Sequence, residues 1–319
     1  MSRPRDVGCG CSVKFSVGLP TDRVDAADEF VTGAAVTEFA AAAEAAGFGA
    51  CYVTDHPFPD DRWLATGGHH ALDPFVVLAV AGAATTTLRL QTHVFVVAYR
   101  NPFLAAKSVL SLDRLSGGRV ILGVASGYLR PEFGALGVDF DERNDLTDEA
   151  IDAMIAAWTS DGVVSDGLHF HARGNTMLPR PVAQPHPPIW VGGNSKLAIR
   201  RAVERGQGWL PFPNPAAASK ALKTPAMESV SDLAERLEYA HDHAVSIGRT
   251  EPLEVCCALF SRSLRGRADD FAAQRDEMAE LEALGVGWIT VQFDAPTRKE
   301  WRVQMERFAA GVMAAGAFA

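Results

Sequence analysis

The feature that most constrains the fold is a regular alternation of short apolar runs and longer helical stretches along almost the whole chain. Eight runs rich in β-branched and aromatic residues have the length of buried strands, at residues 13–19, 50–54, 88–97, 119–125, 188–192, 209–212, 253–260 and 286–293. A stretch of helical character follows each run, at residues 35–46, 73–85, 102–115, 146–158, 196–205, 230–246, 269–284 and 297–314. This order predicts an α/β fold, a (β/α)8 TIM barrel, because an open doubly wound sheet usually has fewer strands.

Three stretches are longer than the connections of a simple barrel. Residues 57–72 follow the second strand, residues 126–143 follow the fourth, and residues 160–187 precede the fifth. The last stretch contains Asp166-Gly167 between Val163-Val164 and His169-Phe170, which predicts a hairpin, and we expect the stretch to cover the barrel mouth. We expect residues 1–12 to form a flexible tail and residues 13–319 to form a single domain.

Composition excludes several classes of partner. The chain has 319 residues with a formal net charge of −9 and no dense run of lysine or arginine, so nucleic-acid binding is not expected. The longest apolar run, at residues 74–84, is too short to span a membrane. Five cysteines without a Cys-x-x-Cys pair, and no secretory signal, favour a cytoplasmic protein with reduced thiols.

Polar residues at the C-terminal ends of the predicted strands are the candidates for chemistry, because barrel active sites form there. The second strand ends in Asp55 and His56, and we interpret His56 as a proton donor or orienting group. The alternative is that Asp55 is a capping or buried carboxylate and that His56 only packs. His69 and His70 lie in the following loop, where we expect mainly solvent contact.

Glycine pairs occur at two different ends of the barrel. Gly192-Gly193 follows the fifth strand and opens a helix, so the turn is a candidate phosphate site, with a plain strand-to-helix turn as the alternative. Gly117-Gly118 instead precedes the fourth strand, which predicts a helix stop.

The third strand carries polar residues in an otherwise apolar run. Gln91, Thr92 and His93 lie between leucine and valine residues, and buried polar groups need hydrogen-bond partners. We expect a bound polar ring to supply them.

The sequence does not support a metal site or serine-hydrolase chemistry. No nearby cysteine, aspartate or glutamate pattern completes a metal site at the histidine pairs 169/171 and 241/243, and no Gly-x-Ser-x-Gly elbow is present. The helix at residues 73–85 is apolar on every side, which predicts a homodimer through the helices after the second and third strands.

Several of these stretches together resemble a known family. They are residues 43–49, 54–56, 90–94, 112–119 and 122–127, and the run Pro187-Pro-Ile-Trp-Val-Gly-Gly193. In order and spacing the chain is similar to the luciferase-like monooxygenases, in particular to the branch that uses the deazaflavin coenzyme F420. The resemblance covers roughly residues 13–310.

The resemblance implies a dimeric barrel that holds a reduced flavin or deazaflavin over its mouth, with the phosphate at the glycine turn. It also implies a non-prolyl cis peptide at His93–Val94. The catalytic candidates are His56, Asp55 and Tyr128. The candidates for cofactor binding are Thr92, His93, Val94, Ser126, Gly127, Gly192, Gly193, Asn194, Ser195 and Lys196.

The chain departs from the family's dehydrogenases, which place carboxylates after the first and fourth strands. Here Leu19-Pro20 and Tyr128 stand at those ends, so a general base is missing unless His56 or Glu132 takes that role. The leading hypothesis is hydride transfer between coenzyme F420 and a small organic substrate. The alternatives are a monooxygenase that uses reduced FMN and O2, and a non-catalytic flavin-binding barrel.

Overall fold

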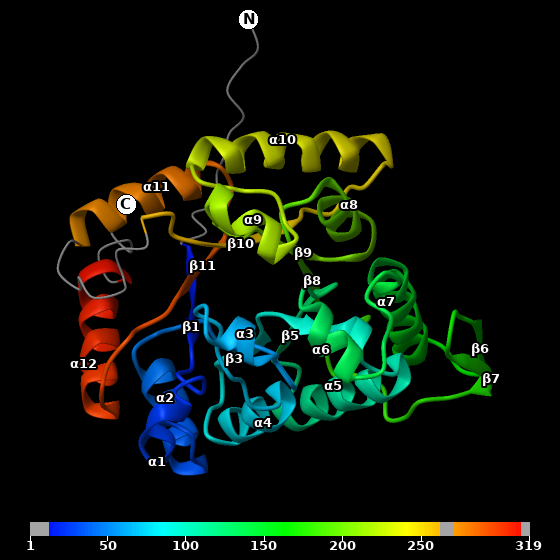
Figure 1. Ribbon diagram of the computed structural model, residues 1–319, viewed down its shortest axis with the longest axis horizontal. Coiled ribbons are helices and arrows are strands. Elements are labelled where there is room, and N and C mark those ends of the chain that lie inside the picture. Colours follow the sequence, from blue (N-terminus) through cyan, green and yellow to red (C-terminus); the bar gives the residue numbers. More distant parts are fainter. Residues whose placement is uncertain (1–12, 262–270, 314–319) are drawn as a thin grey trace, which may run out of the picture.

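A closed parallel barrel forms the centre of the computed structural model, which describes residues 13–261 and 271–313 (Figure 1). β3, at one end of the strand order, also pairs with β5 near the other end, which closes the sheet. The strands are β1 (Lys14–Gly18), β2 (Ala50–Val53), β3 (Arg89–Thr92), β4 (Phe95–Val96), β5 (Val120–Ala125), β8 (Ile189–Gly192), β9 (Gly208–Leu210), β10 (Glu254–Ala258) and β11 (Trp288–Val291). The predicted TIM barrel is therefore confirmed.

β3 and β4 are two parts of the third barrel strand, since both pair with β5. The His93–Val94 peptide bond between them is cis. The cis peptide that the resemblance implies is thus present.

Helices surround the barrel in the predicted order. They are α2 (Gly33–Ala45), α4 (Pro74–Ala83), α5 (Pro102–Ser116), α7 (Arg143–Thr159), α8 (Lys196–Arg205), α10 (Val230–Ser246), α11 (Phe271–Ala283) and α12 (Arg298–Phe308). Side-chain caps explain most of their starts, because a short polar residue accepts a backbone N–H of the first turn. These caps are Thr32, Asp73, Asn101, Ser195, Ser229 and Thr297. α5 ends at Gly117, whose φ of 71° confirms the helix stop.

The apolar core has an inner and an outer layer. The larger one lies between the strands and the helices, whereas a smaller cluster fills the barrel itself. Trp190 and Trp288 lie in the inner cluster with their ring centroids 5.6 Å apart. Gly208 and Gly49 make room for these rings, because a Cβ at either position would lie within 3.1 Å of a tryptophan side chain. Tryptophan rings therefore fill part of the barrel interior.

Short helices occupy the two insertions that follow β2 and β5. They are α3 (Asp61–Leu64) after β2 and α6 (Arg130–Ala135) after β5. Both insertions leave strands at their C-terminal ends, so both lie at the mouth.

The predicted hairpin at residues 160–187 is present, but it does not cover the mouth. β6 (Val163–Asp166) and β7 (His171–Asn175) lie against the outer side of α7 (Figure 1). The N–H of Leu168 donates to Glu149 at 2.6 Å, and His169 Nε2 lies 2.6 Å from Glu142 Oε2. Two carboxylates on α7 hold the hairpin tip there, a pairing that the turn motif alone does not reveal.

Three cysteines, Cys51, Cys256 and Cys257, are buried as free thiols. Burial raises the pKa of Cys51 and of Cys256 to about 12, so both are inert thiols. Cys9 and Cys11, like the expected N-terminal tail, lie outside the described residues. Among the helices of the described ranges, none is long and apolar enough to cross a membrane.

Candidate active site

His56 and Glu132 meet at the barrel mouth from two different insertions. His56 follows β2, and Glu132 lies on α6, after β5. His56 Nδ1 is 3.2 Å from Glu132 Oε2. The imidazole is 8% exposed, and the carboxylate is fully buried.

Glu132 is held as an ionised carboxylate. Its Oε2 also accepts the hydroxyl of Tyr99 at 2.8 Å, and its Oε1 accepts the N–H of Phe58 at 2.9 Å. Burial opposes ionisation, but the hydrogen bonds from His56, Phe58 and Tyr99 outweigh it and lower the pKa of the carboxyl. A buried carboxylate bonded to one imidazole nitrogen fixes the ring's orientation and stabilises its protonated form.

An aromatic cluster surrounds His56 on the side of the mouth. The ring centroid of His56 lies 4.4 Å from Trp63, 5.0 Å from His69 and 6.0 Å from Tyr128. Burial, reinforced by Glu132, raises the pKa of Tyr128 to about 12, so its phenol is a neutral hydrogen-bond donor. His69 therefore lies in this cluster rather than in the solvated loop that we expected.

Both carboxylate oxygens of Asp55 accept hydrogen bonds from other groups of the protein. Arg100 donates to both of its oxygens, at 2.7 Å and 2.8 Å, and the N–H of Val96 donates at 3.0 Å. The carboxylate is 3% exposed. This geometry suits the capping alternative of the sequence analysis, in which Asp55 ties the end of β2 to β4.

Polar residues of the third strand find partners inside the barrel. The hydroxyl of Thr92 donates to the carbonyl of Gly123 at 2.7 Å, and Gln91 accepts the hydroxyl of Ser16 at 2.7 Å. A bound ring is therefore not needed to satisfy these two side chains. His93 is half-buried, and burial lowers its pKa to about 4.

The turn after β8 is built around Asn194, whose side chain faces the protein. Its Nδ2 donates to the carbonyls of Phe212 at 2.7 Å and Pro225 at 3.0 Å, while its Oδ1 accepts the N–H of Phe212 at 2.8 Å. Asn194 thus fastens the segment after β9 to the turn. The N–H of Asn194 also donates to Thr224 Oγ1 at 2.9 Å, so both its side chain and its N–H are used within the protein.

The N–H of Gly193 donates to the carbonyl of Leu210 at 3.2 Å, so the groups that fit an anion at this turn are the N-terminus of α8 and Lys196 beside the glycine pair. Gly192 and Gly193 are half-buried, and Gly193 has a φ of 118°, which a side chain would strain. A Cβ at Gly192 would come within 3.1 Å of Val94 Cγ1, so the bare backbone leaves a cradle beside the cis peptide. Ser195 caps the ten-residue helix α8, and Lys196 begins it. The N-terminus of α8, this lysine and the glycine cradle together fit a phosphate-bearing cofactor.

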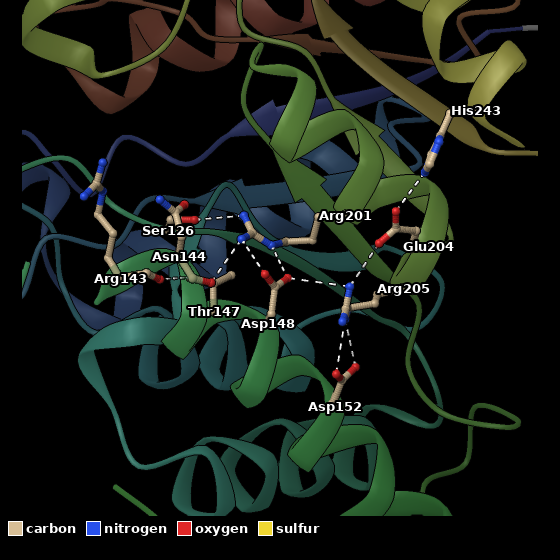
Figure 2. A network of polar contacts seen from close by, with 10 residues as sticks. All are labelled: Ser126, Arg143, Asn144, Thr147, Asp148, Asp152, Arg201, Glu204, Arg205 and His243. Carbon is tan, nitrogen blue, oxygen red and sulfur yellow. Dashed lines mark hydrogen bonds and ion pairs between the residues drawn. The ribbon is translucent and has the colours of Figure 1, made fainter. Parts of the chain in front are cut away.

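Ser126, at the end of β5, is connected to a chain of ion pairs (Figure 2). Arg201 of α8 donates to Ser126 Oγ at 3.0 Å and to Asp148 Oδ1 at 2.6 Å, and it is 3% exposed. Because a guanidinium can only donate, Ser126 accepts from Arg201 and keeps its own proton for another acceptor. The chain continues across α7, α8 and α10 through Arg205, Asp152, Glu204 and His243.

Gly127 follows Ser126 and brings the chain close to the aromatic side chains behind it. Its φ is 77°, and a Cβ there would lie 2.7 Å from Val96 Cγ1 and 2.9 Å from Phe133. The candidates Val94, Ser126 and Gly127 therefore form one half-buried surface with the turn after β8, whereas Thr92 lies fully buried behind it.

Comparison with known proteins identifies the family. The family model of the luciferase-like monooxygenases matches residues 13–258. The chain belongs to the luciferase-like monooxygenase family. An uncharacterized protein of Mycobacterium tuberculosis is 33% identical over 204 residues, which cover 58% of this chain and 70% of that protein. An FMNH2-dependent dimethylsulfone monooxygenase of Pseudomonas putida is 32% identical over 151 residues, which cover 46% of this chain and 39% of that protein.

Solved structures share the fold at lower identity. The monooxygenase RslO1 from Streptomyces bottropensis has a TM-score of 0.75 and 20% identity, with 95% of this chain and 99% of that chain covered. The coenzyme F420-dependent tetrahydromethanopterin reductase from Methanopyrus kandleri has a TM-score of 0.70 and 15% identity, over the same shares. The protein is therefore an enzyme of the luciferase-like monooxygenase family; one relative is named for its use of FMNH2, and one structural neighbour is named for its use of coenzyme F420.

Sequence reasoning overlooked three residues of the site. Trp63 lies on the short helix α3, in an insertion without a recognisable motif, Tyr99 belongs to a 3-10 turn after β4, and Arg100 follows that turn. Glu132 was weighed only as a possible base. A signal for Arg100 did exist, because a buried Asp55 requires a cationic or N–H partner.

Proposed function

We propose that this luciferase-like protein transfers a hydride between coenzyme F420 and a small organic substrate at the barrel mouth. The observation that carries the proposal is the buried pair of His56 and Glu132 at the C-terminal ends of the strands. Hydride transfer to a carbonyl carbon, or from an alcohol carbon, requires a proton to move at the oxygen. A buried imidazole on a carboxylate provides that proton transfer.

The roles of the two residues follow from their contacts. His56 uses Nδ1 for Glu132, and no described residue is a hydrogen-bond partner of Nε2, so Nε2 is available to the substrate oxygen. In the reducing direction Nε2 gives its proton to that oxygen, and in the oxidising direction it takes one. Glu132 stabilises the imidazolium form in either direction, and Tyr128 donates a hydrogen bond nearby. The coenzyme supplies or accepts the hydride when bound.

The cofactor would lie between the end of the third strand and the turn after β8. Gly192, Gly193 and the N-terminus of α8 with Lys196 would hold its phosphate, and Ser126 would donate to an acceptor. His93 and Val94 would lie against its ring.

The surroundings of His56 favour an uncharged, largely apolar substrate. Trp63 and Tyr128 form an aromatic wall beside the imidazole. Phe58 is 69% exposed next to them, although its N–H is fixed by Glu132. The nearest cation on the same strand end, Arg100, is already paired with Asp55. Arg100 is therefore not available to bind an anionic substrate, and an uncharged substrate suits the aromatic wall better.

A second candidate is monooxygenation with reduced FMN and O2. It is favoured by the 32% identity over 151 residues to the FMNH2-dependent dimethylsulfone monooxygenase. The same mouth and the same phosphate turn would serve either coenzyme.

We also propose a homodimer that covers α4 and α5. Val76 on α4 is 65% exposed and Leu104 on α5 is 70% exposed. The two helices are neighbours in the outer layer, so these side chains belong to one apolar face. A second copy of this chain is the proposed occupant.

Titration of the purified protein with F420 and with FMN, followed by tryptophan quenching, tests the cofactor. Micromolar binding of F420 in preference to FMN is expected. Combined Ser195→Ala and Lys196→Ala changes should weaken binding about tenfold, equivalent to about 1.4 kcal/mol. The matched control, Lys220→Ala on α9 (Ala216–Leu222), should not. Preference for FMN would move the assignment to the second candidate, and binding of neither coenzyme would contradict both.

A further inference from the structure

A short chain of hydrogen bonds runs through the interior of the barrel and ends at its mouth. The hydroxyl of Ser16 on β1 donates to Gln91 Oε1 on β3 at 2.7 Å. Gln91 Nε2 lies 3.5 Å from His93 Nδ1. Ser16 and Gln91 are completely buried, whereas His93 is half-buried at the end of β3.

The direction of each hydrogen bond follows from the chemistry of the groups. In the structure the amide oxygen of Gln91 faces Ser16, and because an amide oxygen can only accept, the Ser16 hydroxyl is the donor. The Gln91 amide also hydrogen bonds the thiol of Cys256. Its NH2 group therefore faces Cys256 and His93.

The imidazole of His93 is consequently restricted to one tautomer. An Nδ1 that faces an NH2 group must be the unprotonated acceptor, which leaves the proton on Nε2. The ring is also neutral at physiological pH, because burial lowers its pKa to about 4. The centroid of Tyr52 lies 4.8 Å from that of His93 and supports the ring from the side.

We propose that Ser16 and Gln91 fix His93 as its Nε2–H tautomer, and that this N–H is a neutral hydrogen-bond donor to an acceptor atom of the cofactor ring. The first half rests on the barrel interior alone, and the second rests on the proposed function. Among the described residues His93 Nε2 has no hydrogen-bond partner, and it is the ring nitrogen farther from the buried Gln91. The ligand class is a planar heterocycle with a carbonyl oxygen or an unprotonated ring nitrogen. A neutral donor would bind such an atom without adding a positive charge beside it.

Nitrogen NMR of the ligand-free protein tests the first half. The protein is labelled with ¹⁵N-histidine, the protonation of each ring nitrogen is read from long-range ¹H–¹⁵N correlations, and the His93 signals are assigned with His93→Gln. His93 should be a single Nε2–H tautomer that stays neutral at every pH well above about 4. A mixture of tautomers, an Nδ1–H form, or titration near 6.5, the usual value, would overturn the proposal.

Two variants at Gln91 distinguish the effect of its hydrogen bond on the His93 tautomer from the effect of burial of the imidazole. Gln91→Glu places an acceptor beside Nδ1, so the proton should move to Nδ1 or both nitrogens should be protonated. Gln91→Met keeps the size of the side chain without its hydrogen bonds, and it should release a mixture of tautomers. If His93 remained a pure Nε2–H form in both folded variants, Gln91 would not be what fixes it. The wild-type spectrum decides the tautomer even if a variant does not fold.

Addition of F420, and separately of FMN, tests the second half. Binding should shift the Nε2–H resonance of His93 while that of His243, on α10 and distant from the mouth, stays in place. Binding without a shift at His93 would overturn its role as a donor, although the proposed function would stand. Failure of both coenzymes to bind would count against the proposed function and the donor role together. The tautomer of the ligand-free protein is measured independently of either result.

Discussion

At the scale of single residues, two buried carboxylates at the mouth differ in whether their partners allow proton transfer. Asp55 is matched by a guanidinium on both oxygens, so its charge is compensated within the protein. Glu132 is matched by the imidazole of His56, a group that can exchange a proton, and by the Tyr99 hydroxyl, whose pKa burial raises. The pair with the titratable partner is therefore the one suited to proton transfer.

Glu132→Gln tests that assignment. The amide keeps the size of the side chain but cannot stabilise an imidazolium, so turnover should fall by about 10–100-fold, as for other residues that orient a reacting group. Coenzyme affinity, measured by the same titration as for the wild type, should change little. His56→Ala should cost more, about 10²–10⁴-fold. Glu306→Gln on the exposed face of α12 is the control, and unchanged turnover in Glu132→Gln would refute the role.

Asp55→Asn tests whether the other carboxylate is structural. Removing one partner of a buried ion pair leaves the Arg100 charge uncompensated, which should lower the free energy of unfolding by about 3 kcal/mol. Urea unfolding measures this loss. If turnover were abolished while the unfolding free energy stayed the same, the catalytic role first assigned to Asp55 would be correct.

At the scale of elements, the barrel was predictable because each strand and helix carries its own periodicity and many helices carry their own cap. The functional pairs were not, since they join residues distant in sequence. His56 and Glu132 are 76 positions apart, and Asp55 and Arg100 are 45 apart. The hairpin shows the same limit, because its turn motif is local but the carboxylates of α7 decide where it lies.

Glu44, near the end of α2, illustrates an element junction that depends on pH. Burial opposes its ionisation, but the N–H groups of Thr87, Leu88 and Thr86 and the hydroxyl of Thr87 lower its pKa from 4.5 to about 2. These bonds fix the loop that leads into β3. The folded pKa lies below the unfolded one, so the stabilisation is complete above about 4.5 and is lost as the pH falls toward 2.

Glu44→Gln should therefore destabilise the protein by about 1 kcal/mol at pH 7, since an uncharged acceptor binds N–H groups less strongly. Thermal unfolding of both proteins between pH 7 and pH 3 measures the difference, which should shrink below pH 4.5. Glu235→Gln, at an exposed position of α10, should show no such pH dependence. A difference that grew on acidification would have the wrong sign for this carboxylate.

At the scale of the whole molecule, the barrel covers the inner side of α4 and α5 but not the outer one. Val76 and Leu104 remain exposed there, and a charge on either would be buried without a partner in a dimer. Val76→Glu with Leu104→Glu should therefore convert a dimer to a folded monomer, measured by light scattering and circular dichroism. Val303→Glu, at a 45% exposed apolar position on α12, should remain dimeric. A wild-type protein that is monomeric at micromolar concentration would contradict the proposed interface, and dimers that persist in the double variant would place the interface elsewhere.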